Sequence, residues 1–407
     1  EAIDSVITAK KSEQLVNGTK RLKDYQFHDR LDTLKELNLS HAGLTEIPEF
    51  VYSATAMEVL ILDYNDIKKL PKELGTLPNL KRIYWRANKL DTYWWIRIQQ
   101  IKGIEKLDIS NNLLTRLPMG VKNLKELEEL VVDENFLGEI PINRLSKAKT
   151  IKTVSFNKSH DLSIGSGDYS KLDFIEVFKV NKSGIETLNP TFYQMAGLKE
   201  LQLQENHLET ITSGISNLKN LKKLSFYKNQ LVSLPDDLFE MDLQVIDLYY
   251  NKLEVIPESI GNFTALEVLF LAHNRIYSLP ESIGQLVHLE EFYAHHNRLS
   301  VLPSTLNNLS KMKVARVNDN YLTEFPTQLL DLKNLVDLDV SNNQLTTLHP
   351  SVEKLPSLEL FSYQENPIDF SSKENEFISP MIIRMLNRGV TCVPRIYKEE
   401  VSANSQD

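Results

Sequence analysis

Apolar residues recur along this chain in an eleven-position pattern, LxxLxLxxNxL, in which x stands for any residue. The pattern reads MEVLILDYNDI from Met57, LEVLFLAHNRI from Leu266 and LVDLDVSNNQL from Leu335. Its second and third leucines are two positions apart, so both point to one face of a short strand. The pattern therefore predicts a series of short strands, each with one buried face.

The polar position of this pattern can be followed through most of the chain. It occurs fifteen times between residues 42 and 366, with a mean spacing of about 23 residues. The exceptions to asparagine are Ala42, Ser159 and Ser183. An amide can donate to and accept from the backbone of a buried turn, whereas serine does this in part and alanine not at all. We therefore predict a structural ladder formed by Asn65, Asn88, Asn112, Asn135, Asn206, Asn229, Asn251, Asn274, Asn297, Asn320, Asn343 and Asn366.

The second half of each repeat differs from the first, and its fullest form is LPxxIGxLxxL, as at residues 256–261 and 279–284. Proline removes a backbone donor, so this half is not a strand. The whole unit resembles the 23-residue leucine-rich repeat of bacterial (leptospiral-like) proteins and of intracellular Ras-group-related proteins, over roughly residues 31–370. The resemblance implies an α/β solenoid, a horseshoe of about 15 repeats with a parallel concave β-sheet and short helices, 3₁₀ turns or loops on its convex side.

The ends of the repeat array should be capped, because a solenoid exposes its core there. We expect an N-terminal helical cap at residues 1–30, the array at 31–370 and a C-terminal helix and strand with a flexible tail at 371–407. Ser379 followed by Pro380 predicts the N-cap of a helix over 381–387.

Two segments depart from the repeat. The array is irregular near 157–174, where DLSIGSG at 161–167 replaces the proline-bearing arm. This segment is either a loop on the convex side or a hinge between two sub-arrays. Tyr93-Trp94-Trp95 occupies the arm of the third repeat, where the rings either pack into the convex layer or leave Trp94 as an exposed contact.

The amino-acid composition narrows the classes of protein to which this chain can belong. The chain is 42% hydrophobic and 25% charged, with a net charge of −9, which is typical of a soluble folded protein. It has no basic stripe for nucleic acid and no apolar run long enough for a transmembrane segment. Cys392 is the single cysteine, so the cysteine-rich caps of animal extracellular repeat proteins are absent. We expect a monomer, with an exported bacterial location (periplasmic, surface-anchored or secreted) favoured over a cytoplasmic one.

Motifs of catalysis are missing from the sequence: GxxxxGK[ST], GxGxxG, HExxH and GxSxG do not occur. We therefore predict no enzymatic activity and no cofactor. His273, His295 and His296 could suggest a metal site, but adjacent strand residues should diverge and no cysteine or near carboxylate completes a ligand set. We expect no metal ion, and a pH-sensitive interface remains an alternative role for these histidines.

Outward positions of the strands carry the candidate binding residues. Repeats 9–12 concentrate aromatic and histidine side chains there, which is typical of a binding surface, although tyrosine is also common on ordinary strands. This predicted aromatic patch comprises Tyr227, Tyr249, Tyr250, Phe270, His273, Tyr293, His295, His296 and Arg316. A smaller second patch, which is either a second contact or merely solvated strand surface, comprises Ile61, Tyr64, Arg82, Tyr84 and Arg86. We predict a non-catalytic module that binds a protein partner on the concave face, with a lectin-like glycan-binding role or an intracellular scaffold as alternatives.

Overall fold

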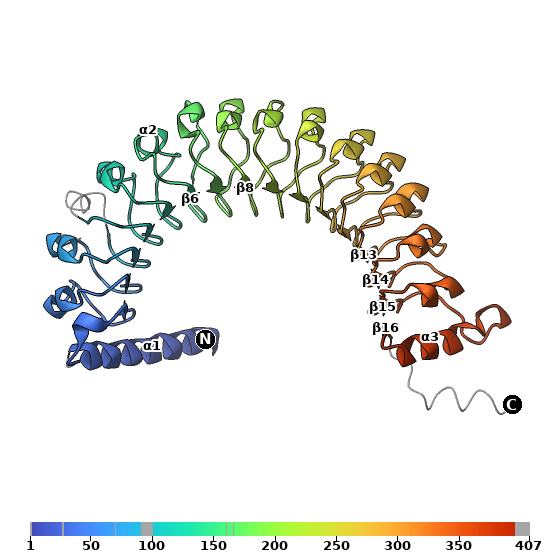
Figure 1. Ribbon diagram of the computed structural model, residues 1–407, viewed down its shortest axis with the longest axis horizontal. Coiled ribbons are helices and arrows are strands. Elements are labelled where there is room, and N and C mark those ends of the chain that lie inside the picture. Colours follow the sequence, from blue (N-terminus) through green and yellow to red (C-terminus); the bar gives the residue numbers. More distant parts are fainter. Residues whose placement is uncertain are drawn as a thin grey trace. The chain divides into compact units, whose positions relative to one another are not determined.

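The computed structural model describes residues 2–26, 28–69, 71–90, 101–159, 161–165 and 167–394, the side chains of 2–9 and 11 excepted. The chain forms two compact units, Glu1–Leu203 (unit 1) and Gln204–Asp407 (unit 2). Each unit is a stack of coils, with strands along one side and short helices along the other (Figure 1). The predicted packing of 93–95 and the predicted flexible tail at 398–407 lie outside the described residues.

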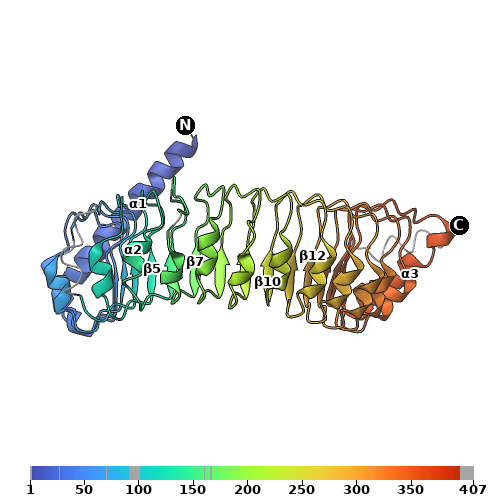
Figure 2. The same cartoon turned by 90° about the horizontal axis from the view of Figure 1, so that it is seen from above.

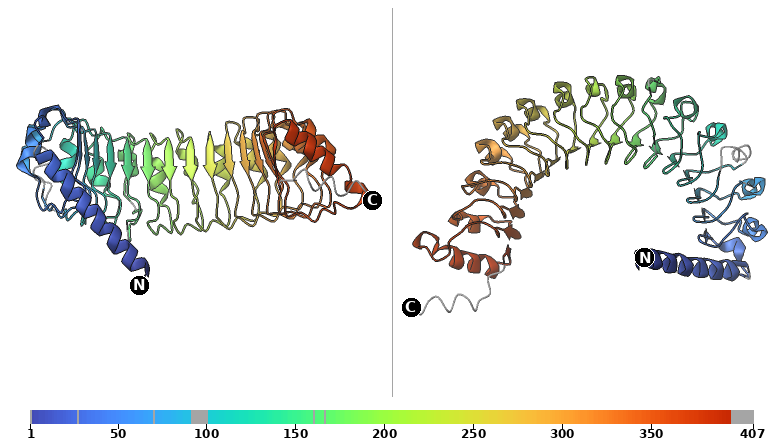
Figure 3. Two further views of the ribbon diagram at one scale, coloured as in Figure 1. Left: turned by 90° about the horizontal axis from the view of Figure 1, so that it is seen from below. Right: turned by 180° about the vertical axis from the view of Figure 1, so that it is seen from behind.

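Every strand is three residues long and runs parallel to its neighbours, in the order of the sequence. Seen from below, the strands of each unit lie as parallel arrows (Figure 3). Unit 1 holds β1 (Glu36–Asn38), β2 (Val59–Ile61), β3 (Arg82–Tyr84), β4 (Lys106–Asp108), β5 (Glu129–Val131), β6 (Thr153–Ser155), β7 (Val177–Lys179) and β8 (Glu200–Gln202). Unit 2 holds β9 (Lys223–Ser225), β10 (Val245–Asp247), β11 (Val268–Phe270), β12 (Glu291–Tyr293), β13 (Val314–Arg316), β14 (Asp337–Asp339), β15 (Leu360–Ser362) and β16 (Thr391–Val393).

The opposite side of the coils carries 3₁₀ helices, because the repeated proline starts a tight turn there. Pro257 and Pro280, for example, adopt φ −75° and directly precede η10 and η11. Unit 1 contains α2 (Ile142–Leu145), η1 (Leu31–Thr33), η2 (Glu49–Ser53), η3 (Lys72–Thr76), η5 (Met119–Asn123), η6 (Tyr169–Leu172) and η7 (Pro190–Gln194). Unit 2 contains η8 (Ile215–Asn217), η9 (Asp236–Glu240), η10 (Glu258–Asn262), η11 (Glu281–Gln285), η12 (Ser304–Asn308), η13 (Thr327–Asp331), η14 (Pro350–Lys354) and η15 (Lys373–Asn375). The predicted fold class, a parallel sheet backed by 3₁₀ turns, is confirmed.

The core lies between the strands and the 3₁₀ helices. Met57, Leu60, Leu62 and Ile67 of the second repeat are all fully buried, as the pattern predicts for its apolar letters. Burying an aliphatic side chain of this size stabilises the fold by about 1.5–3 kcal/mol. Because each coil shows the same apolar positions to the next, this stabilisation accumulates between neighbouring coils.

The asparagines tie each coil to the one before it. Asn65 Oδ1 accepts from the amide of Leu44 at 3.0 Å, and its Nδ2 donates to the carbonyls of Leu39 and Leu62 at 2.9 Å. The side chain thus satisfies backbone groups in two coils that would otherwise be buried without partners.

Serine makes a weaker version of this rung at two adjacent positions. Ser183 Oγ accepts from the amide of Ser159 at 3.2 Å and donates to the carbonyl of Phe156 at 3.0 Å. Ser159 is fully buried, and its own hydroxyl has no hydrogen-bond partner within the described residues. The boundary between the two compact units falls after Leu203, beyond both serines, so the hinge interpretation of this region stays a prediction.

A residue with left-handed backbone precedes every rung. Tyr250, His273 and His296 have φ of 55°, 52° and 52°, in a region that non-glycine residues seldom adopt. The strand has already ended at this point, so the side-chain alternation of a strand no longer applies there. The full row is His41, Tyr64, Ala87, Asn111, Glu134, Lys158, Lys182, Glu205, Lys228, Tyr250, His273, His296, Asp319, Asn342 and Glu365.

Helices lie at the two ends of the chain. In unit 1, α1 (Ala2–Gln26) lies against the first coil and extends beyond it (Figure 2). Gly18 lies so close to that coil that a Cβ would be 2.1 Å from the carbonyl oxygen of His41. Arg21 donates to the carbonyl of Ser40 at 2.8 Å. No helix among the described residues has both the length and the apolar character needed to cross a bilayer.

The C-terminal helix begins earlier than the sequence predicted. In unit 2, α3 spans Ile378–Asn387 with Phe377 as its N-cap, so the prediction of Ser379 as N-cap is wrong. Ile378 is fully buried together with Met381 and Ile382, and this apolar contact draws it into the first turn. Pro380 is tolerated because the first four amides of a helix have no intrahelical acceptor.

Candidate functional site: the aromatic patch of unit 2

The parallel register places the predicted patch residues on successive strands. Phe270 on β11 pairs with Tyr293 on β12, which in turn pairs with Arg316 on β13. The Phe270 and Tyr293 rings stack with centroids 4.8 Å apart and planes 12° from parallel. The Arg316 guanidinium lies 5.9 Å from the centre of the Tyr293 ring. These three side chains form one row across the sheet.

Tyr249 is the centre of the other half of the patch. Its ring lies 5.9 Å from that of Tyr227, 4.8 Å from that of Tyr250 and 5.0 Å from that of His273. Its hydroxyl shares a hydrogen bond of 2.9 Å with Nε2 of His295. Because this bond spans two repeats, it fixes the tyrosine and the histidine across the strand between them.

The left-handed row adds a continuous ring stack beside this centre. Tyr250 stacks on His273 with a centroid distance of 4.0 Å, and His273 stacks on His296 at the same distance. His295 connects the two halves, since its ring lies 5.4 Å from Tyr249 and 6.4 Å from Tyr293. All nine residues of the aromatic patch therefore lie in one connected cluster.

One expectation about the histidines is wrong. His295 and His296 were expected to diverge as neighbours on a strand, but their ring centroids are 5.5 Å apart. The reason is the left-handed backbone of His296, which follows the end of the strand and turns its side chain toward the same surface. Even so, no group of three or more potential metal-ligating side chains with suitable geometry occurs in the part of the chain that is described.

The environment keeps the centre of the patch uncharged near neutral pH. Burial lowers the pKa of His295 to about 4, and repulsion from Arg316 and from the protonated forms of His296 and His273 adds to this effect. Burial also lowers the pKa of His273. At pH 7 these two rings are neutral.

Carboxylates surround this neutral centre, and the sequence reasoning missed two of them, Asp319 and Asp337. Asp337 accepts from Arg316 Nη2 at 2.7 Å, and Asp319 lies 3.4 Å from Nε2 of His296. The Tyr293 hydroxyl donates to Glu291 at 2.8 Å. Burial together with this bond raises the pKa of Tyr293 to about 12. The repeat period contains the necessary signal, because it places position 337 on the strand next to Arg316.

Side chains of the second patch interact with neighbouring side chains of unit 1. Arg86 donates through Nη2 and Nε to Asp63 at 2.6 and 2.9 Å, and Asp63 is only 3% exposed. Tyr64 stacks on His41 with a centroid distance of 4.4 Å. Lys106 lies 5.6 Å above the ring of Tyr84. Ile61 and Tyr84 are paired across β2 and β3, while Arg82 is exposed on β3.

Comparison with known protein families finds the repeat itself. A family model described as leucine rich repeat matches residues 219–276 and 243–299, and a second such model matches residues 334–355. The adenylate cyclase of Schizosaccharomyces pombe is 25% identical over 231 residues, which is 56% of this chain and 13% of the cyclase. A human volume-regulated anion channel subunit is 25% identical over 233 residues, 56% of this chain and 24% of that protein. These matches cover only a minor part of either relative.

Comparison with solved structures extends the likeness to most of the chain. A leucine-rich repeat protein of Leptospira interrogans has a TM-score of 0.71 and 26% identity, covering 91% of this chain and 97% of that one. The Drosophila Toll–Spätzle complex gives a TM-score of 0.70 at 19% identity, covering 88% and 50%, a likeness of fold alone. The repeated pattern, the parallel strands and these matches identify the chain as a leucine-rich repeat protein that is similar to those of bacteria.

Proposed function

We propose that the chain is a non-catalytic module that binds a protein partner, and that the aromatic patch of unit 2 is its binding surface. The observation that supports this most directly is the single connected cluster of rings centred on Tyr249 and His273. One structural neighbour is itself solved as a complex of two proteins, Toll and Spätzle. A repeat fold of this kind offers a long surface of strands and few enclosed sites for chemistry.

The energetics of the patch favour association. Tyrosine and arginine supply large contact areas with polar ends, and they dominate the binding energy of many interfaces. The rings of Tyr250 and His273 are already ordered by stacking at 4.0 Å, so less side-chain entropy is lost when a partner binds. Since His295 is neutral at pH 7, the centre of the patch suits apolar or aromatic groups of a partner.

We further propose a bacterial, exported or surface-associated setting for this module; the likeness to the Leptospira interrogans protein supports the bacterial part. An intracellular signalling scaffold is the alternative. Protease treatment of intact cells that produce the protein tests surface exposure, because a surface protein is cut while a periplasmic or intracellular one is protected. Protection of the protein in intact cells, with cleavage after lysis, would contradict the surface assignment.

The binding surface can be tested by selecting peptides from a displayed random library on the whole chain. We then compare their affinities for the wild-type protein and for Tyr249→Ala plus Tyr293→Ala. Two truncated hot-spot tyrosines should together weaken binding by roughly 30- to 1000-fold. Neither ring is in the buried core, so thermal unfolding should change little.

Tyr64→Ala plus Tyr84→Ala in unit 1 is the matched control, because it removes two tyrosines from the second patch. We expect it to leave the affinity of the selected peptides unchanged. Peptides that bind the aromatic-patch variant as tightly as the wild type would refute the assignment. A glycan array probed with the same proteins tests the rival lectin-like role, which the stacked faces of Phe270 and Tyr293 also suit. Glycan binding lost in this variant, with no peptides selected, would favour that rival.

A further inference from the structure

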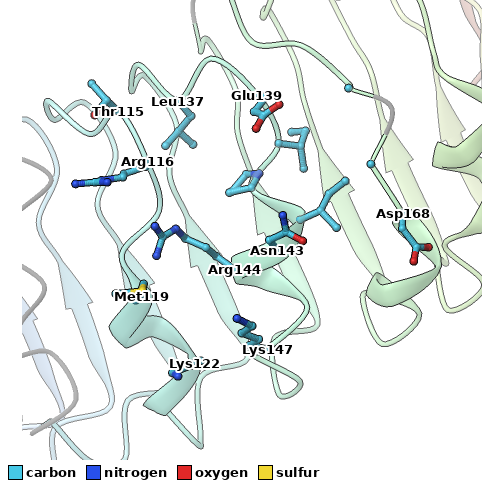
Figure 4. A pocket seen from close by; sticks show the side chains of 15 residues that line it. Thr115, Arg116, Met119, Lys122, Leu137, Glu139, Asn143, Arg144, Lys147 and Asp168 are labelled. Carbon is cyan, nitrogen blue, oxygen red and sulfur yellow. The ribbon is translucent and has the colours of Figure 1, made fainter.

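A pocket in unit 1 lies beside the irregular repeat. The amide of Ser163 donates to the carbonyl of Gly138 at 2.8 Å, and its carbonyl accepts from the amide of Ile140 at 3.2 Å. An isolated parallel bridge between Glu139 and Ser163 marks this pairing. At Ser163 the segment therefore runs parallel to the preceding coil, at the place where the other repeats have their proline-bearing arm. The adjoining pocket has a volume of about 510 Å³ (Figure 4).

Four basic side chains line this pocket. Arg116 and Lys122 come from the coil around η5, and Arg144 and Lys147 come from α2 and the turn after it. Arg144 and Lys147 are three residues apart, which puts them on the same side of a helical turn. Figure 4 shows the four along one part of the pocket, with Asp168 at the far side. All four positive charges thus lie around one pocket.

These four cations have no internal counter-charge within the described residues. Several other lysines of unit 1 pair with a glutamate of a neighbouring coil, as Lys158 does with Glu134 at 2.8 Å. Within the described residues, no ion pair and no side-chain hydrogen bond is formed by Arg116, Lys122, Arg144 or Lys147.

The two carboxylates that line the pocket do not cancel this charge. Asp168 is already engaged by the hydroxyl of Ser170 and by Lys171 at 3.2 Å, and these partners lower its pKa. Glu139 is the only other acidic side chain in the lining. The pocket therefore carries an excess of positive charge, although the chain as a whole has a net charge of −9.

We propose that this pocket binds a small organic ligand that carries a phosphate or sulfate ester. Guanidinium groups bind such oxyanions through two parallel hydrogen bonds, and two arginines with two lysines offer enough positive charge for a phosphate monoester, with up to two negative charges, or a sulfate ester, with one. The volume suits a small molecule. Met119 and Pro141 supply apolar surface for the body of the ligand. This site is separate from the protein-binding function proposed for unit 2.

Glycine keeps one wall of the pocket in place. A Cβ on Gly167 would lie 2.3 Å from Cδ1 of Ile142, so only glycine allows this approach without a shift. Gly167 therefore lies close against Ile142 of α2, the helix that also carries Arg144.

Calorimetric titration of the whole chain with phenyl phosphate, phenyl sulfate and phenol tests this proposal. We expect at least one ester to bind at micromolar to millimolar concentration and phenol not to bind. Arg116→Gln plus Arg144→Gln should weaken binding by about 30-fold or more, because each removes a charge-assisted pair of hydrogen bonds. Arg275→Gln plus Arg298→Gln, which removes two exposed arginines of unit 2, is the matched control and should not change the affinity.

The pattern of binding identifies the ligand class: preference for phenyl phosphate indicates phosphate esters, and preference for phenyl sulfate indicates sulfate esters. If the arginine variant unfolds, Lys122→Gln plus Lys147→Gln takes its place, since both lysines are exposed. Three results overturn the proposal. They are no binding of either ester at millimolar concentration, undiminished binding by the variant, and an equal loss in the control.

Discussion

Replacing one asparagine of the ladder with alanine should destabilise unit 2 locally and strongly. Asn343 is 2% exposed. Its Oδ1 accepts from the amide of Leu322 at 3.0 Å, and its Nδ2 donates to the carbonyls of Val317 and Val340 at 3.1 Å. Asn343→Ala removes all of these hydrogen bonds at once. It leaves an amide and at least two carbonyls buried without this partner.

The magnitude follows from those orphaned groups. A buried polar group that loses its partner costs about 1–3 kcal/mol, and the carbonyls keep other acceptor capacity, so we expect about 3–5 kcal/mol in total. Asn343→Ser should cost about 1–3 kcal/mol, because a hydroxyl can accept one bond and donate one, as Ser183 does. Asn334→Ala is the control. Its amide donates to Ser310 at 2.7 Å on the exposed side, and its loss should cost about 1 kcal/mol or less.

Hydrogen exchange is the suitable assay because coils of a repeat protein can open locally, without global unfolding. We measure the free energy of opening at the Leu322 amide and the midpoint of urea unfolding. Both should decrease in the order wild type, Asn343→Ser, Asn343→Ala. The reasoning is refuted if Asn343→Ala lowers these values no more than Asn334→Ala does, or if serine and alanine have equal effects.

Three further predictions concern other features of the chain. The pKa of His295 is about 4 in the folded state and about 6.5 in the unfolded state. Because the unfolded state is protonated first, the unfolding free energy is at its full value above pH 6.5 and decreases as pH falls toward 4. Because the ring is partly exposed, the unfolding free energy of the wild type should decrease by about 1–2 kcal/mol more than that of His295→Gln between pH 7 and pH 4, and an equal decrease would contradict the assignment. Arg86→Met removes the guanidinium from the buried Asp63, which keeps only its bond from the backbone amide of residue 86, and should lower the unfolding free energy at pH 7 by about 1–3 kcal/mol; a denaturation midpoint like that of Arg82→Met would argue against it. Gly197→Ala would place a Cβ 2.0 Å from the carbonyl oxygen of Asp173 and should lower the melting temperature by several degrees, whereas Gly138→Ser, with open space around it, tests backbone strain alone.

Most of the fold could be predicted from the sequence because the repeat fixes the phase of every coil. Leu60 and Leu62 of one repeat lie in the core for the same reason as their counterparts in the others. The failures lie where local and tertiary preferences compete. Ser379 and Pro380 are good helix starters, but burial of Ile378 moves the start of α3 forward.

The sequence predicts which residues belong to the candidate site, but it does not predict how their side chains are arranged. The period shows which side chains leave the sheet, so all nine residues of the aromatic patch could be named. It does not show that the row before each asparagine has left-handed backbone, and this conformation brings His296 beside His295. The basic pocket of unit 1 was missed altogether, because Arg116 and Arg144 belong to different repeats and converge only beside the irregular segment.

The left-handed row is a second ladder along the coils, exposed where the asparagine ladder is buried. Its members interact with the same position one repeat away: Tyr64 stacks on His41, Lys158 pairs with Glu134, and Lys228 pairs with Glu205. In the aromatic patch the same row is a stack of Tyr250, His273 and His296. A left-handed residue with a side chain is costly, by roughly 1–2 kcal/mol, and each contact offsets part of that cost. The asparagine ladder uses the same side chain at nearly every rung, whereas the left-handed row uses different side chains, several of which contact their counterpart in the next coil. The identity of the surface can therefore change in pairs while the coil stays the same, which is how a rigid repeat can present an aromatic surface in one stretch and ion pairs in another.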